Sequence, residues 1–126
     1  MREAVTSPTA APAIGPYSPA LRVGNLLFLS GQIPLDPSTG QLVGDDVRAQ
    51  AVRVMENIGE LLRAAGVGFG AVARTTVFLQ DLGDFAVMNE VYASYFQEPY
   101  PARSTVQVAR LPRDVRIEID VIAIVD

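Results

Sequence analysis

The sequence predicts an α+β fold in which two amphipathic helices cover one face of a mainly antiparallel sheet. Two stretches carry apolar residues at helical spacing, and five others are β-branched or alternate between polar and apolar residues. Their order is strand, strand, helix, strand, helix, strand, strand. With 126 residues the chain is long enough for a core, and we expect a single domain spanning residues 1–126.

The N-terminal segment predicts an arm followed by a stiff connection. Residues 1–13 are rich in Ala, Pro and Thr, a composition typical of a loosely held terminus. Residues 14–19 have prolines on both sides of Tyr17, and proline restricts its own backbone and that of the preceding residue. The direction of the Tyr17 ring is therefore fixed. On the residues alone, simple packing at a loop edge is favoured over a role in a site.

Two short strands are expected next, at residues 20–23 and 26–30. They flank Gly24-Asn25, a pair typical of the two-residue turn of a β-hairpin. Ser30 ends the second strand and could be an ordinary hydroxyl at a strand end. Because Gly31 has no side chain, a ligand could approach the backbone closely beside Ser30.

The first helix has clear start and stop signals. Asp45 or Asp46 can cap a helix that runs to about Ala65, and Gly66 is typical of the residue after a helix end. The apolar stripe that would face the core comprises Val47, Ala51, Val54, Ile58, Leu61 and Leu62.

A strand and a second helix follow. Residues 71–79 are β-branched and aromatic and predict the strand. Asp81 or Asp84 can cap a helix that continues through Phe96. Its apolar stripe comprises Phe85, Met88, Tyr92, Tyr95 and Phe96. Asn89 lies near that stripe, where a polar residue more often makes an ordinary packing contact than a functional one.

The C-terminal residues predict a second hairpin, most simply antiparallel. Residues 101–109 and 116–124 both alternate with a period of two, which is typical of half-buried strands. Pro112 lies in the turn-like segment between them and cannot donate to a ladder of strand hydrogen bonds.

That hairpin would bring a cation and two carboxylates together. If the apolar faces of its strands join, Arg103 stands beside or diagonal to Glu118 and Asp120 on one sheet face. A structural ion pair and a functional site are both compatible with this arrangement. Two helices cannot cover both faces of the sheet, so we expect an oligomer that buries the second face.

Composition narrows the possible chemistry. The chain has no Cys, His or Trp, and all ten basic residues are Arg. Thiolate nucleophiles, Cys/His zinc sites, imidazole bases and lysine Schiff bases are therefore excluded. A net charge of −4 makes nucleic acid an unexpected partner. No apolar run is long enough to cross a membrane and the start lacks a signal peptide, so a cytoplasmic protein is expected.

Several motifs occur in order along almost the whole chain. They are Ala13–Tyr17, Ser30–Pro34, Arg74–Leu79, Asp84–Asn89, Pro101–Ser104, and Val108–Pro112 continuing to Ile117–Ile119. With these motifs the sequence resembles the RidA/YjgF family of reactive-intermediate deaminases, which act on imines and enamines. The resemblance implies a chorismate-mutase-like fold (ββαβαββ) assembled as a homotrimer, with active sites in the clefts between subunits.

The resemblance also implies roles for individual residues. Arg103 would bind the substrate carboxylate, and Glu118 would place or activate the attacking water. The other expected pocket residues are Tyr17, Ser30, Gly31, Asn89 and Thr105. Position 105 is often Cys in deaminating members and is Thr here, and the segment 97–100 is short, so the pocket rim and the substrate preference can differ.

The implied reaction is hydrolysis of a small carboxylate-bearing imine such as 2-iminopropanoate, the tautomer of 2-aminoacrylate, or 2-iminobutanoate. An iminium is already a good electrophile, so no metal and no cofactor are expected. Two other functions remain open. One is a ribonuclease or translation inhibitor, and the other is a carboxylate-metabolite binding or chaperone-like module without turnover.

Overall fold

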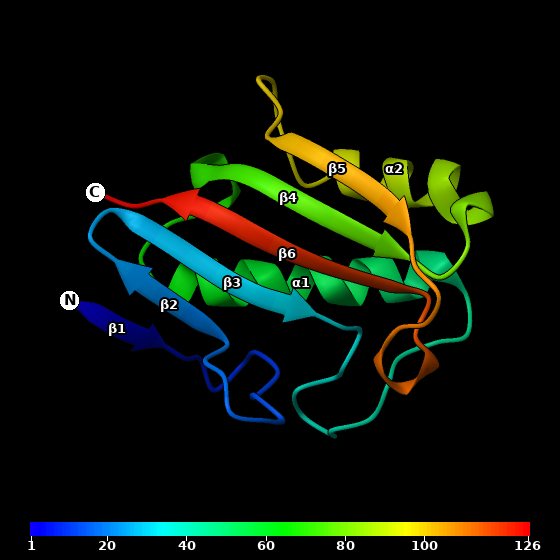
Figure 1. Cartoon of the computed structure of the whole chain (residues 1–126), viewed down its shortest axis with the longest axis horizontal. Coiled ribbons are helices and arrows are strands. Elements are labelled where there is room, and N and C mark those ends of the chain that lie inside the picture. Colours follow the sequence, from blue (N-terminus) through cyan, green and yellow to red (C-terminus); the bar gives the residue numbers. More distant parts are fainter.

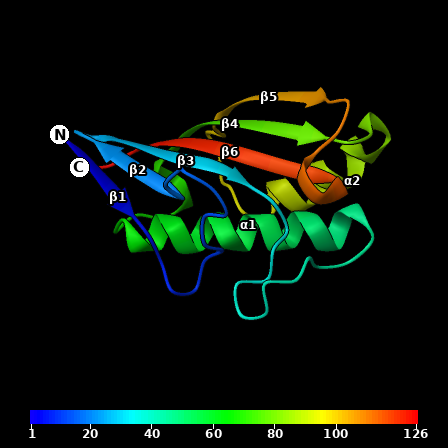
Figure 2. The ribbon, with the colours of Figure 1, turned by 60° about the horizontal axis from the view of Figure 1, so that its bottom comes forward.

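The computed structural model describes residues 1–126 and contains one six-stranded sheet with two helices on one side (Figures 1 and 2). The strands are β1 (Arg2–Val5), β2 (Ala20–Val23), β3 (Leu26–Gln32), β4 (Val72–Leu79), β5 (Ala102–Gln107) and β6 (Ile117–Ile124). The helices are α1 (Val47–Ala64) and α2 (Phe85–Ala93). The strand order is β1-β2-β3-β6-β4-β5, and only the β4–β5 pair is parallel. The predicted α+β fold is confirmed.

Helix α1 has the expected ends. The Asp46 side chain caps its start by accepting a hydrogen bond from the backbone N–H of Ala49 at 2.8 Å. Just after its end, Gly66 has a φ of 82°, a left-handed conformation that favours glycine. The buried apolar side chains of α1 include Val47, Ala51, Val54, Ile58, Leu61 and Leu62. This stripe packs under the sheet, and Figure 2 shows α1 running beneath it.

Helix α2 is shorter than predicted. It ends at Ala93 rather than at Phe96, and the hydroxyl of Ser94 donates to the carbonyl oxygen of Val91 at 2.6 Å. A side-chain hydrogen bond of this kind competes with continuation of the helical ladder. Phe96 still packs in the core, with its ring centroid 4.7 Å from that of Tyr92.

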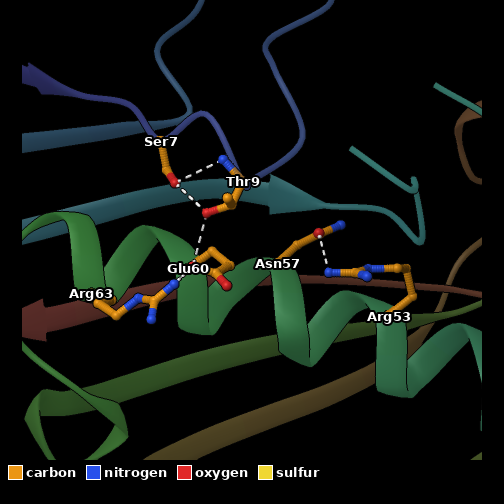
Figure 3. A network of polar contacts seen from close by, with 6 residues as sticks. All are labelled: Ser7, Thr9, Arg53, Asn57, Glu60 and Arg63. Atoms are coloured by element: carbon orange, nitrogen blue, oxygen red, sulfur yellow. Dashed lines mark hydrogen bonds and ion pairs between the residues drawn. The ribbon is translucent and has the colours of Figure 1, made fainter. Parts of the chain in front are cut away.

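The N-terminal segment is not the loosely held arm that its composition predicts. Strand β1 pairs antiparallel with β2 at one edge of the sheet, and Val5 and Ala10 are buried. The Thr9 hydroxyl donates to Glu60 of α1 at 3.0 Å, and Figure 3 shows this contact beside Ser7. The arm is ordered because the β2 edge supplies backbone partners and α1 supplies a polar anchor.

The predicted C-terminal hairpin is wrong. Strands β5 and β6 do not pair with each other, because β4 lies between them and pairs with both. The apolar face of β6 is fully buried, and β6 takes a central place where both of its edges are paired. The more polar β5 forms the outer edge, which Figure 1 shows beside β4. Alternation identified both strands but could not identify their neighbours.

The sheet face opposite the helices, here called the open face, carries exposed apolar side chains. Phe28, Val106 and Ile124 lie on it with exposed fractions of 38%, 41% and 42%. The strand neighbours of Phe28 and Ile124 belong to the core on the other side of the sheet. None of the helices is both long and apolar enough to span a membrane.

Candidate active site in two parts

One part of the candidate site is a cavity of about 340 Å³, here called the Glu118 pocket. Four residues predicted for the site line it: Tyr17, Ser30, Gly31 and Glu118. They come from the segment before β2, from β3 and from β6, which β3 contacts directly. The remaining lining residues are Ala11, Pro12, Ala13, Ile14, Pro19, Gln32, Ile33, Leu35 and Pro112.

Local irregularity in β3 makes room for the Glu118 carboxyl. The register of β3 against β6 shifts between Leu29 and Gln32, as in a β-bulge, and bulges are frequent beside functional sites. A side-chain Cβ at Gly31 would lie 2.8 Å from Cδ of Glu118 and closer still to its Oε2. A side chain at position 31 would therefore displace the Glu118 carboxyl from this place.

The hydroxyl groups of the Glu118 pocket are oriented by the backbone around them. Ser30 Oγ donates to the carbonyl oxygen of Ser18 at 2.7 Å, which leaves the lone pairs of its own oxygen as acceptors. The Tyr17 hydroxyl accepts a 3.3 Å hydrogen bond from the backbone N–H of Ile14, and the residue is 46% exposed.

The Glu118 carboxyl is electrostatically unusual. Burial raises its pKa above the ordinary value, and the negative charge of Asp120 raises it further. No ion pair of the structure offsets this effect, because the paired acidic residues are Glu60, Glu90, Asp84 and Asp114. Glu118 is thus a carboxyl that exchanges its proton closer to neutral pH than an exposed one does.

The second part of the candidate site is here called the Arg103 cluster. Arg103 on β5 points toward α2, where its guanidinium carbon lies 4.8 Å from the Tyr92 ring centroid and 5.6 Å from that of Phe85. Its Nη1 is 3.9 Å from the sulfur of Met88. None of the ion pairs involves Arg103, so its positive charge has no carboxylate partner within the chain.

Two more predicted site residues lie near the Arg103 cluster. Thr105 follows Arg103 by two residues and faces the same side of β5, and its buried hydroxyl has no hydrogen-bond partner within the chain. Asn89 is half-buried and belongs to the same face of α2 as Phe85 and Tyr92, at spacings of four and three residues.

The two parts lie on opposite faces of the sheet. Arg103 is level with Thr75 of β4, whose side chain faces α2, whereas Glu118 is level with Phe78 and faces the open side. The prediction that Arg103 stands beside Glu118 and Asp120 in one chain is therefore wrong. The prediction fails because β4 lies between β5 and β6, so each of these strands takes its own register against β4.

Comparison with known proteins assigns the chain to a family. Residues 8–125 match the family described as Endoribonuclease L-PSP. The chain belongs to this family, the RidA/YjgF family. A RutC family protein of Pyrococcus horikoshii is 52% identical over 123 residues, which are 98% of this chain and 98% of that protein.

Other members of the family carry more specific names. The 2-iminobutanoate/2-iminopropanoate deaminase of Mus musculus is 48% identical over 124 residues, covering 98% of this chain and 92% of that protein. E. coli TdcF, whose crystal structure has bound serine, is 45% identical in sequence to this chain, and its fold matches with a TM-score of 0.93. That match covers 98% of this chain and 99% of the TdcF chain.

Some residues around the candidate site were not identified from the sequence. Phe85, Met88 and Tyr92 were recognised only as an apolar stripe, because nothing in the pattern says that an arginine will lie over them. Asn57 and Gln50 had a visible signal, since each interrupts the apolar side of the first helix and both are buried. Their contacts place them beside the segments that border the Glu118 pocket.

Proposed function

We propose that the protein hydrolyses small 2-imino acids, such as 2-iminopropanoate and 2-iminobutanoate, to 2-ketoacids and ammonia. The observation that carries the proposal is the Glu118 pocket, in which a carboxyl with a raised pKa faces a cavity also lined by Tyr17 and Ser30. Membership of a family that includes the named imine deaminase of Mus musculus supports it.

Arg103 is the proposed carboxylate-binding residue. A guanidinium can bind a carboxylate through two parallel N–H···O hydrogen bonds, which a point cation such as ammonium cannot reproduce. Arg103 has no acidic partner within the chain, so a substrate carboxylate does not have to displace one. The serine bound by E. coli TdcF also carries a carboxylate, which is consistent with a family preference for small amino-acid-like ligands.

Glu118 is the proposed base and acid. Its carboxylate takes a proton from water as the water oxygen attacks the carbon of the C=N bond. Glu118 then gives this proton to the nitrogen of the tetrahedral intermediate, and the C–N bond breaks so that ammonia leaves. The C=O bond of the 2-ketoacid forms as the remaining hydroxyl proton passes back to the Glu118 carboxylate. A carboxyl with a raised pKa is suited to both transfers. The oriented Ser30 oxygen is available to accept a hydrogen bond from the water or the imine.

The proposed site is completed by a second copy of the chain. Arg103 and Glu118 of one chain face opposite sides of the sheet, so one substrate cannot contact both. We therefore place the substrate between the Arg103 cluster of one subunit and the Glu118 pocket of its neighbour. A closed homotrimer would supply three equivalent sites of this kind and cover the open face.

The family description favours one other function, because it names an endoribonuclease. The net charge of −4 and the absence of His and Lys weaken that candidate for this chain. An RNA-cleavage assay on the same preparations distinguishes the two functions.

Competition with semicarbazide tests imine hydrolysis. A pyridoxal-dependent dehydratase generates the imines from serine or threonine, and semicarbazide traps them as semicarbazones. Added wild-type protein should lower semicarbazone formation without any metal or cofactor. Arg103→Lys should reduce kcat/KM about ten- to hundredfold, because one hydrogen bond to a charged group is worth about 1.5–3 kcal/mol. Glu118→Gln should slow turnover and leave binding of the 2-ketoacid product nearly unchanged.

The control substitution is Arg63→Lys, because Arg63 lies on the solvent side of α1 and pairs with Glu60. It should retain full activity. If folded wild-type protein leaves semicarbazone formation unchanged for both imines, the hydrolysis proposal is contradicted. A carboxylate-binding module without turnover would then be the better reading.

Mixing of inactive subunits tests the shared site. Arg103→Ala and Glu118→Gln proteins are unfolded together, refolded as an equal mixture and assayed. If each site takes Arg103 from one subunit and Glu118 from the next, about a quarter of the sites regain both residues. Activity confined to the level of the separate variants would contradict a site shared between subunits.

A further inference from the structure

We propose that Phe85 and Tyr92 act as positioning residues that hold Arg103 through their aromatic rings and leave its charge free for a single carboxylate. The inference rests on the proposed carboxylate-binding role of Arg103. It adds the reason why a half-buried arginine stays in place, and stays available, when no acidic side chain binds it.

The contacts of the guanidinium support this inference. Both ring centroids lie within the ~6 Å at which a cation is attracted to an aromatic face. Phe85 and Tyr92 are seven residues apart on α2, so two turns of one helix present them on the same side. Met88, between them, is fully buried and offers its sulfur to Nη1 at 3.9 Å.

The Tyr92 ring is itself fixed. Its hydroxyl shares a 2.8 Å hydrogen bond with Thr75 Oγ1, and both side chains are buried. The Phe96 ring packs against it. Thr75 is the residue of β4 that lies level with Arg103 of β5, so a single register positions both the arginine and the anchor of its ring.

Aromatic contacts suit an arginine that must bind an anion. A carboxylate partner would occupy the N–H groups of the guanidinium and oppose its charge, and a substrate would have to displace it. A ring contacts the flat face of the guanidinium instead and takes up none of the N–H donors in its plane. Those donors form the fork that fits a carboxylate, so the cluster favours ligands with one carboxylate over neutral ligands.

Phe85 allows a clean test because it is 39% exposed and its replacement does not open the core. Binding of 2-oxobutanoate and of its neutral amide is measured by calorimetry for wild type, Phe85→Leu and Phe85→Tyr. Phe85→Leu should bind the acid about three- to tenfold more weakly, within the range expected for one cation–π contact. Phe85→Tyr keeps a ring and should restore the wild-type affinity. Affinity for the amide should be the same in all three.

A matched control separates positioning from general destabilisation. Phe69 is a partly buried phenylalanine that packs on Tyr95 and Phe96 and makes no contact with Arg103. Phe69→Leu should bind 2-oxobutanoate like wild type, whatever its unfolding midpoint. In turnover, Phe85→Leu should raise KM and leave kcat nearly unchanged, because the carboxylate contact is present in both ground state and transition state.

The outcomes distinguish this inference from the proposed function. If wild type binds 2-oxobutanoate and folded Phe85→Leu binds it equally well, the positioning role is overturned and the deaminase proposal stands. If wild type neither binds 2-oxobutanoate nor hydrolyses imines, the proposed function falls and the positioning role falls with it.

Discussion

At the scale of single residues, Glu118 combines a proposed catalytic role with a cost to stability. Its carboxyl lies against Gly31, is half-buried, and has Asp120 two residues away on the same face of β6. Burial and the charge of Asp120 both disfavour the ionised carboxylate, and the fold contains no cation paired with it. Groups that are unfavourable for folding and lie in a pocket are common in active sites.

Replacement of Glu118 should therefore stabilise the fold at neutral pH. The pKa of Glu118 is raised above its ordinary 4.5 in the folded protein, so its favourable contribution is present below the unfolded pKa and is lost as pH rises through the folded pKa. Glu118→Gln stays neutral and avoids this loss. Urea unfolding should show Glu118→Gln more stable than wild type at pH 7, with the difference vanishing below about pH 4.5. A variant that is less stable than wild type at pH 7 would contradict this.

Asp36 provides a control of opposite sign for the same measurement. Hydrogen bonds from the Ser38 hydroxyl and backbone N–H lower the pKa of Asp36 from 3.8. Its contribution to stability is present above the unfolded pKa and is lost as pH falls through the folded pKa. Asp36→Asn should thus be less stable than wild type at pH 7, and the gap should close in acid.

At the scale of elements, α1 holds the segments that border the Glu118 pocket. Its fully buried Asn57 donates to the carbonyl oxygens of Leu35 at 2.9 Å and Ile33 at 3.4 Å, and both residues line the pocket. Gln50 accepts from the backbone N–H of Arg116 at 2.8 Å, two residues before Glu118. Two amides on the apolar side of one helix thus connect it to two loops.

Loss of the Asn57 amide should destabilise the fold and loosen the pocket. Asn57→Leu keeps a similar volume but leaves the carbonyl oxygen of Leu35 without its donor, whereas that of Ile33 still accepts from the backbone N–H of Leu35. A buried carbonyl without a donor costs about 1–3 kcal/mol. Urea unfolding measures the loss in the free energy of unfolding. Backbone hydrogen exchange should become faster in residues 33–43 if the pocket segment loosens. Arg53 donates to the Asn57 side chain at 2.9 Å, a contact drawn in Figure 3, so Arg53→Gln should have a smaller effect than Asn57→Leu. Equal stability of Asn57→Leu and wild type would show that α1 does not hold this segment.

At the scale of the whole molecule, the open face and the divided site point to the same assembly. The helices cover one face of the sheet, and the other carries Phe28, Val106 and Ile124 without cover. Exposed apolar surface of this kind is typical of an interaction surface. The proposed homotrimer would cover it and bring the Arg103 cluster of one subunit to the Glu118 pocket of the next.

A charge on the open face should therefore prevent assembly. Wild type should sediment at equilibrium as a homotrimer at micromolar concentration. Phe28→Glu should shift it toward monomers, because an unpaired carboxylate would be buried in the interface. Val52→Glu is the matched control, since Val52 is 41% exposed on the outer side of α1. A monomeric wild type, or a trimeric Phe28→Glu, would contradict assembly through this face.

The sequence by itself determined the elements and their faces. The ends of α1 follow from Asp46 and Gly66, because a capping carboxylate and a residue free to adopt a positive φ act locally. The alternation in β6 correctly separates the buried Ile117 and Ile119 from Glu118, because successive side chains of a strand point to opposite faces. The motifs also identified the family.

Only the tertiary structure decided which strands are neighbours, and with them the geometry of the candidate site. Backbone hydrogen bonds between strands have the same chemistry for nearly every residue, so alternation encodes a strand's face but not its partner. The buried β6 took the centre, β4 separated it from β5, and Arg103 came to face α2 while Glu118 faced the open side. The sequence could name the two residues, but their separation by the sheet depends on contacts between segments far apart in the chain.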